Sequence, residues 1–131
     1  MSNYNAFDDK EIEMTTFDFE DGNGPVPAHK HPNGGGWVAD TATVDETAYV
    51  GAEARVFDYA KVFDYAKVYD NVKVFGNAQV CGGAQVYGDA RVFGDARVYG
   101  DARVYGDAGV FGDARVYGNA WVYDNAKVFG D

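Results

Sequence analysis

The 131-residue sequence contains no leucine and a single isoleucine, Ile12. Its apolar residues are almost entirely valine, alanine, tyrosine and phenylalanine. A chain without leucine is not built for a conventional helical or mixed core, so we expect neither. The length is that of one domain.

Three further absences in the sequence bear on where in the cell the protein is expected to act. Because Cys81 is the only cysteine, no internal disulfide can form. No apolar run approaches the length needed to cross a bilayer, and no basic segment followed by an apolar stretch stands at the N-terminus. We therefore expect a cytoplasmic protein that neither crosses a membrane nor carries a secretory signal.

The net charge of −10 argues against direct binding to nucleic acid or to an anionic membrane. Residues 1–36 contain seven acidic residues and two lysines, and residues 37–131 contain fourteen acidic and nine basic residues. The sequence therefore predicts an acidic leader followed by a longer part whose alternating charges are typical of a solvated surface.

Valine recurs every six residues, sixteen times without a slip, from Val38 to Val128. Alanine stands two residues before each of these valines from Val44 onward, except that Val72 takes that place once. A period of six would spread the valines around a whole helix. The pattern Ala-x-Val-x instead predicts a short strand with alanine and valine on one face. The Gly-Asp or Gly-Asn that follows in most later units predicts a tight corner.

The unit Val-aromatic-Gly-Asp/Asn-Ala-Arg resembles the hexapeptide repeat of left-handed parallel β-helices, in which three units make one coil of a triangular prism. The resemblance covers residues 37–131. It implies an all-β, single-stranded left-handed parallel β-helix of about five coils, with residues 1–36 as leader and N-terminal cap. The stretch HKHPNGGGWVADTATV, residues 29–44, is also similar to the start of short hexapeptide proteins of bacterial and phage type.

With three units per coil, the residues that follow the repeated valines fall on three walls. The Phe wall carries Ala39 and then Phe57, Phe75, Phe93, Phe111 and Phe129. The mixed wall carries Asp45, Phe63, Cys81, Tyr99 and Tyr117, and Cys81 there predicts a shallow dent. The Tyr wall carries Gly51 and then Tyr69, Tyr87, Tyr105 and Tyr123. The choice between phenylalanine and tyrosine thus follows an eighteen-residue period.

Five outward phenylalanines would form an apolar stripe as large as the largest patch of a typical monomer, or larger. We therefore expect the Phe column to be an interface with another copy or another protein. The alternative is that the stems of Arg55, Lys73, Arg91 and Lys127 lie over the rings. The resemblance adds the expectation of a homo-oligomer, a trimer or a dimer.

Two other surfaces are candidates for binding. Tyr69, Tyr87, Tyr105 and Tyr123, with Trp121 nearby, could form a platform for sugar rings or for a protein surface. The alternative is that tyrosine is simply a strand-favouring residue that tolerates water. The corner residues Asp89, Asp95, Asp101, Asp107 and Asp113 form an expected column of acids. They either accept local backbone hydrogen bonds or imitate DNA phosphates, as an inhibitor of a host protein would.

Chemistry would have to come from His29 and His31, the only histidines. On an extended segment they face the same way and could hold a metal or supply a general base. The resemblance implies precedents, since acyltransferases of the family use a histidine base and its carbonic anhydrases hold zinc with three histidines. Here a third ligand is missing and no loop interrupts the coils. We therefore predict a non-enzymatic, oligomeric binding or structural protein without a cofactor. The alternative is an acyltransferase with a histidine base at a subunit interface.

Overall fold

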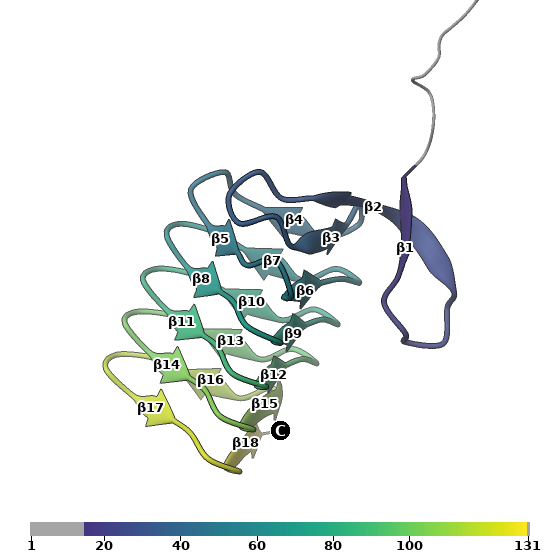
Figure 1. Cartoon of the computed structure of the whole chain (residues 1–131). Helices are drawn as coiled ribbons and strands as arrows, with labels where there is room; N and C mark the ends of the chain where they lie inside the picture. The colour runs from purple at the N-terminus through teal and green to yellow at the C-terminus, as the bar shows by residue number, and fades with distance from the viewer. Residues whose placement is uncertain (1–14, 131) are drawn as a thin grey trace, which may run out of the picture.

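The computed structural model describes residues 15–130, and the regular elements in this range are β-strands (Figure 1). A hairpin of β1 (Thr16–Asp18) and β2 (Pro25–Lys30) precedes the coils. The strands of the coils are β3 (Trp37–Ala39), β4 (Thr43–Val44), β5 (Tyr49–Val50), β6 (Arg55–Val56), β7 (Lys61–Val62), β8 (Lys67–Val68), β9 (Lys73–Val74), β10 (Gln79–Val80), β11 (Gln85–Val86), β12 (Arg91–Val92), β13 (Arg97–Val98), β14 (Arg103–Val104), β15 (Gly109–Gly112), β16 (Arg115–Val116), β17 (Trp121–Val122) and β18 (Lys127–Gly130). This part of the chain holds no helix long and apolar enough to cross a membrane.

The strands form three sheets, each made of every third strand of the coils. The Phe wall is the sheet β3-β6-β9-β12-β15-β18, extended at one edge by β2 and β1. The mixed wall is β4-β7-β10-β13-β16, and the Tyr wall is β5-β8-β11-β14-β17. Within the coils all pairing is parallel and joins residues eighteen apart, so that Val92 lies between Val74 and Val110. The prediction of a triangular prism of about five coils is confirmed.

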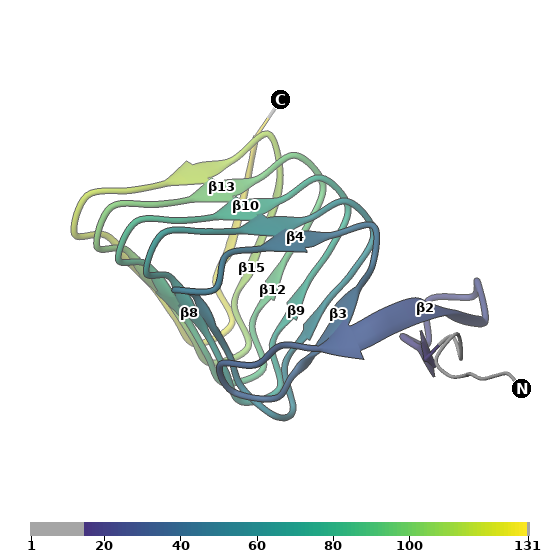
Figure 2. The same ribbon diagram turned by 90° about the horizontal axis from the view of Figure 1, so that it is seen from above.

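The hand of the coil is visible from the N-terminal end of the prism. In Figure 2 the chain runs from β3 to β4 and on to the side of β8 in the counter-clockwise direction, while it moves away from the viewer. The solenoid is therefore left-handed. The usual right-handed crossover rule does not hold for this chain, in which short strands and corners alternate without helices.

The interior of the prism is filled by the repeated valines and alanines. Most of these side chains, among them Val56, Val98 and Ala96, have no exposed surface, while Val44 and Val128 at the two ends are partly buried. The narrow space between three sheets explains the missing leucine, because a larger side chain would overpack it.

The corners need a left-handed backbone, which glycine adopts without a steric penalty. Gly76 and Gly94 have φ values of 67° and 68° at equivalent corners. In the earlier coils aspartate takes this position, as in Asp64 with φ 60°. Its carboxylate accepts a hydrogen bond of 3.1 Å from the Gly82 N–H of the next coil, which offsets part of the backbone strain.

The corner aspartates do not form one column, so that prediction is wrong. Asp95 and Asp113 lie between the Phe and mixed walls, Asp101 lies between the mixed and Tyr walls, and Asp89 and Asp107 lie between the Tyr and Phe walls. The physical reason is that consecutive units turn consecutive corners of the prism. The acids are therefore divided among three edges, and a single anionic array does not form.

The leader ends in a loop that covers the top of the first coil. Strand β2 pairs antiparallel with β3, and residues 31–36 then turn back over the prism. The Val50 N–H donates to the Asn33 carbonyl at 3.0 Å, and the Gly36 N–H donates to the Val50 carbonyl at 3.0 Å. These bonds satisfy backbone groups that an uncovered first coil would leave free.

Candidate functional site

The Phe column, made of the rings of Phe57, Phe75, Phe93, Phe111 and Phe129, is a regular feature of the outer surface. Consecutive rings from Phe57 to Phe129 lie 4.9, 4.9, 5.1 and 5.2 Å apart and are within 14° of parallel. The spacing is close to that of neighbouring strands, so each ring stacks on the next coil. The prediction that these five rings share one column is confirmed.

The N-terminal hairpin covers the first part of the column. Each position of the column is called a rung. The first rung is occupied by Ala39, which has no ring, and Phe19 of the leader places its own ring there, 4.9 Å from that of Phe57. Phe57 is consequently only 4% exposed. Phe17 stacks on Trp37 at 4.7 Å, and the Arg55 guanidinium lies 5.0 Å from the Phe17 ring. Glu20 adds an ion pair with Arg55 at 3.6 Å.

The remainder of the Phe wall has no such cover among the described residues. Phe75 packs at the border of the hairpin cluster, Phe93 and Phe111 are half-buried, and Phe129 is 67% exposed. A groove of about 700 Å³ lies between the rings of Phe93 and Phe111 and the side chains of Arg91 and Lys127. It exists because Gly109 stands in a column that otherwise carries large side chains.

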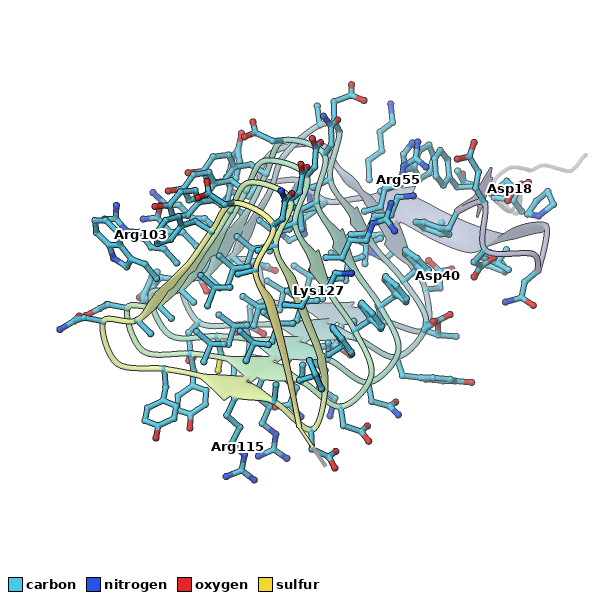
Figure 3. The ribbon with its side chains drawn as sticks, turned by 90° about the horizontal axis from the view of Figure 1, so that it is seen from below. Asp18, Asp40, Arg55, Arg103, Arg115 and Lys127 are labelled. Atoms are coloured by element: carbon cyan, nitrogen blue, oxygen red, sulfur yellow. The ribbon has the colours of Figure 1, made fainter. Side chains whose placement is uncertain are left out.

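Among residues 15–130, no basic head group makes a cation–π contact with a ring of the Phe column. The cation–π contacts in this range join Lys30 to Trp37, Arg55 to Phe17 and Arg103 to Trp121. Figure 3 shows Arg103 and Arg115 projecting from different walls, away from the prism.

Charge alternates across one rung of the open Phe wall, the rung of Phe93. From one edge of the wall to the other, the outward residues of this rung are Asp89, Arg91, Phe93 and Asp95. Within residues 15–130 the ion pair is Arg55–Glu20, and His29 contacts Asp40, so neither Arg91 nor Asp95 is paired within this part of the chain. At this rung a base and an acid thus flank Phe93 on opposite sides, whereas at the rung of Phe111 the base is replaced by Gly109.

The predicted Tyr platform is a second stack. Tyr69, Tyr87 and Tyr105 follow one another at 5.0 Å and lie within 4° of parallel, and Tyr123 follows at 5.5 Å. Trp121 meets Tyr105 edge-on, with ring centroids 6.5 Å apart. Burial is the main cause that raises the pKa of the Tyr69 phenol, and the neighbouring Tyr87 and Asp70 raise it further. At neutral pH the Tyr69 end of the stack therefore presents a neutral phenol.

A hollow of about 460 Å³ opens where the Tyr column ends. The next rung toward the N-terminus is Gly51, so one face of the Tyr69 ring is turned toward the hollow and the other toward Tyr87. Packing favours glycine at position 51, because a Cβ there would lie 2.9 Å from the Cβ of Tyr69, which is too close. Sequence reasoning assigned no role to this gap, although Gly51 stood in the column.

The two histidines occupy different surroundings, contrary to the prediction that they face the same way. His29 is exposed, and its Nδ1 donates to the Asp40 carboxylate at 2.7 Å. His31 is 4% exposed, and its Nε2 donates to the Ala48 carbonyl at 2.8 Å. Strand β2 ends at Lys30, so the alternation of a strand does not extend to His31. In the described range, no group of three or more histidine, cysteine, aspartate or glutamate residues could hold a metal.

The cysteine of the mixed wall interrupts its aromatic column. Cys81 is half-buried and free, between the rungs of Phe63 and Tyr99. Burial is the main cause that raises the pKa of its thiol, the Asp64 carboxylate raises it further, and Arg97 lowers it. A raised pKa leaves little thiolate at neutral pH, so the geometry gives no support for a nucleophile here.

Sequence reasoning missed the aromatic residues that lie off the three columns. Phe17 and Phe19 cover the Phe wall, and Tyr59 and Tyr65 stand exposed at corners where later units have Asn, Asp or Gly. The signal for the cover was the alternation of Phe17 and Phe19, together with the missing ring at Ala39. Neither signal specifies the contact alone, because the two segments are twenty residues apart.

Comparison with known families finds a match within the coils. A family model described as the YdcK β-solenoid repeat matches residues 84–97, 96–112 and 108–124. These are the most regular coils. No curated protein and no solved structure matches the chain at a significant level.

Proposed function

We propose that this member of the β-solenoid repeat proteins is a non-enzymatic binding and structural protein, which associates with a second copy of itself through the uncovered part of the Phe wall. The observation that carries the proposal is that the N-terminal hairpin covers only the first part of the Phe column. Phe57 is buried under the chain's own hairpin, whereas Phe93, Phe111 and Phe129 continue the same stack with no such cover from residues 15–130.

The hairpin shows what kind of surface this wall accepts. An aromatic side chain completes the Phe column, a second aromatic lies against a basic side chain, and an acid pairs with that base. A second copy offers the same chemistry on the open part of its own wall, where Phe93 is flanked by Arg91 and Asp95. Burying stacked rings removes apolar surface from water, which is the main driving force of association.

The charge order at the rung of Phe93 is complementary to itself. We place a two-fold axis parallel to the prism and along the facing Phe columns, so that two prisms lie side by side and run the same way. Arg91 of one copy then faces Asp95 of the other, and the reverse contact repeats it, as a two-fold interface requires. The hairpins lie together at one end of this pair.

The alternative function, an acyltransferase with His29 or His31 as base, has less support. The ring of His31 is buried against a backbone carbonyl, and His29 stands exposed beside Asp40. From β3 to β18 the strands follow one another at six-residue spacing, and no longer loop shapes a donor site between them.

The test is the mass of the full chain in solution. Sedimentation equilibrium should give about twice the chain mass for the wild type and the single-chain mass for Phe111→Asp, because a carboxylate at the centre of the interface would be buried unpaired. Phe63→Asp is the matched control, because it makes the same substitution at the equivalent position of the mixed wall. This variant should keep the dimer mass. A monomeric wild type, or a Phe111→Asp variant of unchanged mass, would refute the proposal.

A further inference from the structure

The hollow at the end of the Tyr column has the shape and lining of a binding site for one ring. It lies on a different wall from the proposed interface, so its function is independent of self-association. Tyr69 supplies a flat apolar floor, and Tyr49 stands beside the gap, with its Cε2 3.5 Å from the Cβ position of Gly51. A ring placed there would be the next rung of a stack whose spacing is 5.0 Å.

The rim of the hollow carries both acceptors and donors. Glu53 and Asp70 lie on the corner side, and Lys67 and Gln85 come from β8 and β11. One oxygen of Asp70 accepts from the Gly88 N–H at 3.1 Å, and the Gln85 carbonyl oxygen accepts from the Tyr69 hydroxyl at 3.4 Å. Glu53 and Lys67 make no ion pair with another described residue. Polar groups on the rim are therefore available to a ligand.

These groups select among ring-shaped ligands. A plain aromatic ring would bring no donors, so it would desolvate Glu53 and Asp70 without compensation. An anion would be repelled by the two carboxylates, which outnumber Lys67 on the rim. A neutral ring with one apolar face and hydroxyl groups around its edge satisfies the floor and the rim together.

We infer that this hollow binds a pyranose ring of a carbohydrate, with its C–H face on Tyr69 and its hydroxyl groups donating to Glu53 and Asp70. Lys67 and the Gln85 amide donate to the remaining hydroxyl oxygens. The volume of about 460 Å³ is within the range of small-molecule sites and leaves room for one or two sugar units.

Saturation-transfer NMR on the full chain tests the inference. The probes are methyl α-D-glucopyranoside, methyl β-D-galactopyranoside and N-acetyl-D-glucosamine. At least one of these sugars should receive saturation at its ring C–H protons. We expect a dissociation constant in the millimolar range, which corresponds to a binding free energy of about 4 kcal/mol. Ala52→Trp, which fills the hollow from its exposed edge, and Glu53→Gln should each weaken binding at least tenfold.

Two variants on the same wall serve as controls. Tyr123→Ala removes a ring from the far end of the column, and Asp107→Asn removes a carboxylate from the same corner position as Glu53, three coils away. Both should bind the sugar as the wild type does. The inference is overturned if none of the three sugars binds, if Ala52→Trp and Glu53→Gln bind as well as the wild type, or if indole binds in the hollow in place of the sugars.

Discussion

Phe19 stacks on Phe57 with ring centroids 4.9 Å apart, the same spacing that separates Phe57 from Phe75 in the next coil. A residue of the leader thus acts as the first rung of a column that the repeats build. The contact buries Phe57 almost completely and fixes the hairpin to the solenoid. It divides the Phe wall into a covered part and an open part.

Phe19→Ala should release the hairpin while the solenoid stays folded. The side chain is 2% exposed, and removing a buried phenylalanine costs roughly 3–5 kcal/mol. Amide hydrogen exchange checks this, because the Ala28 N–H of β2 should lose protection while the Val92 amide of the central coils keeps it. Equal protection of Ala28 in the variant and in the wild type would contradict the account of the cover.

Two glycines of the coils should respond to alanine in opposite ways. Gly100 turns a corner at φ 68°, and a Cβ there would lie 2.9 Å from the Gly118 nitrogen. Gly100→Ala should therefore lower the free energy of unfolding by more than about 1–2 kcal/mol, the cost of the left-handed backbone alone. Urea denaturation measures the change.

Gly109→Ala is the matched comparison. Gly109 lies in a strand, and a Cβ would stand 3.8 Å from the Phe111 ring, which is ordinary contact. Alanine there should leave stability unchanged or raise it by about 0.4–1 kcal/mol, because it restricts the unfolded chain. Equal losses at Gly100 and Gly109 would show that the corner conformation is not what requires glycine.

Much of the fold follows from local spacing in the sequence. The valine register predicts the strands. The eighteen-residue period, with which Phe follows Phe93 at 111 and Tyr follows Tyr99 at 117, predicts which residues share a wall. Both patterns depend only on neighbouring units of the repeat. The cover by Phe19, the burial of His31 and the hollow beside Gly51 depend on contacts between distant segments. Repeat spacing carries no information about such contacts, so these parts of the candidate sites needed the structure.

The thiol of Cys81 should react slowly and with a shifted pH dependence. Burial and the Asp64 carboxylate raise its pKa, so half-maximal alkylation by iodoacetamide should occur at a higher pH than for a free cysteine. Asp64→Asn removes the negative charge, lowers this pKa and should speed the reaction at pH 8. Arg97→Gln removes the positive charge and should slow it. Identical pH–rate profiles for the wild type and both variants would contradict the assigned causes.

The most direct measurement of the central claim is the mass of charge-reversed chains, alone and mixed. In the proposed pair Arg91 of each copy faces Asp95 of the other, so Arg91→Asp places two acids together and Asp95→Arg places two bases together. Sedimentation equilibrium should show each variant alone as a monomer, and a one-to-one mixture as a dimer in which both contacts are restored. Dimers of either variant alone, or a mixture that stays monomeric, would contradict self-association through the Phe wall.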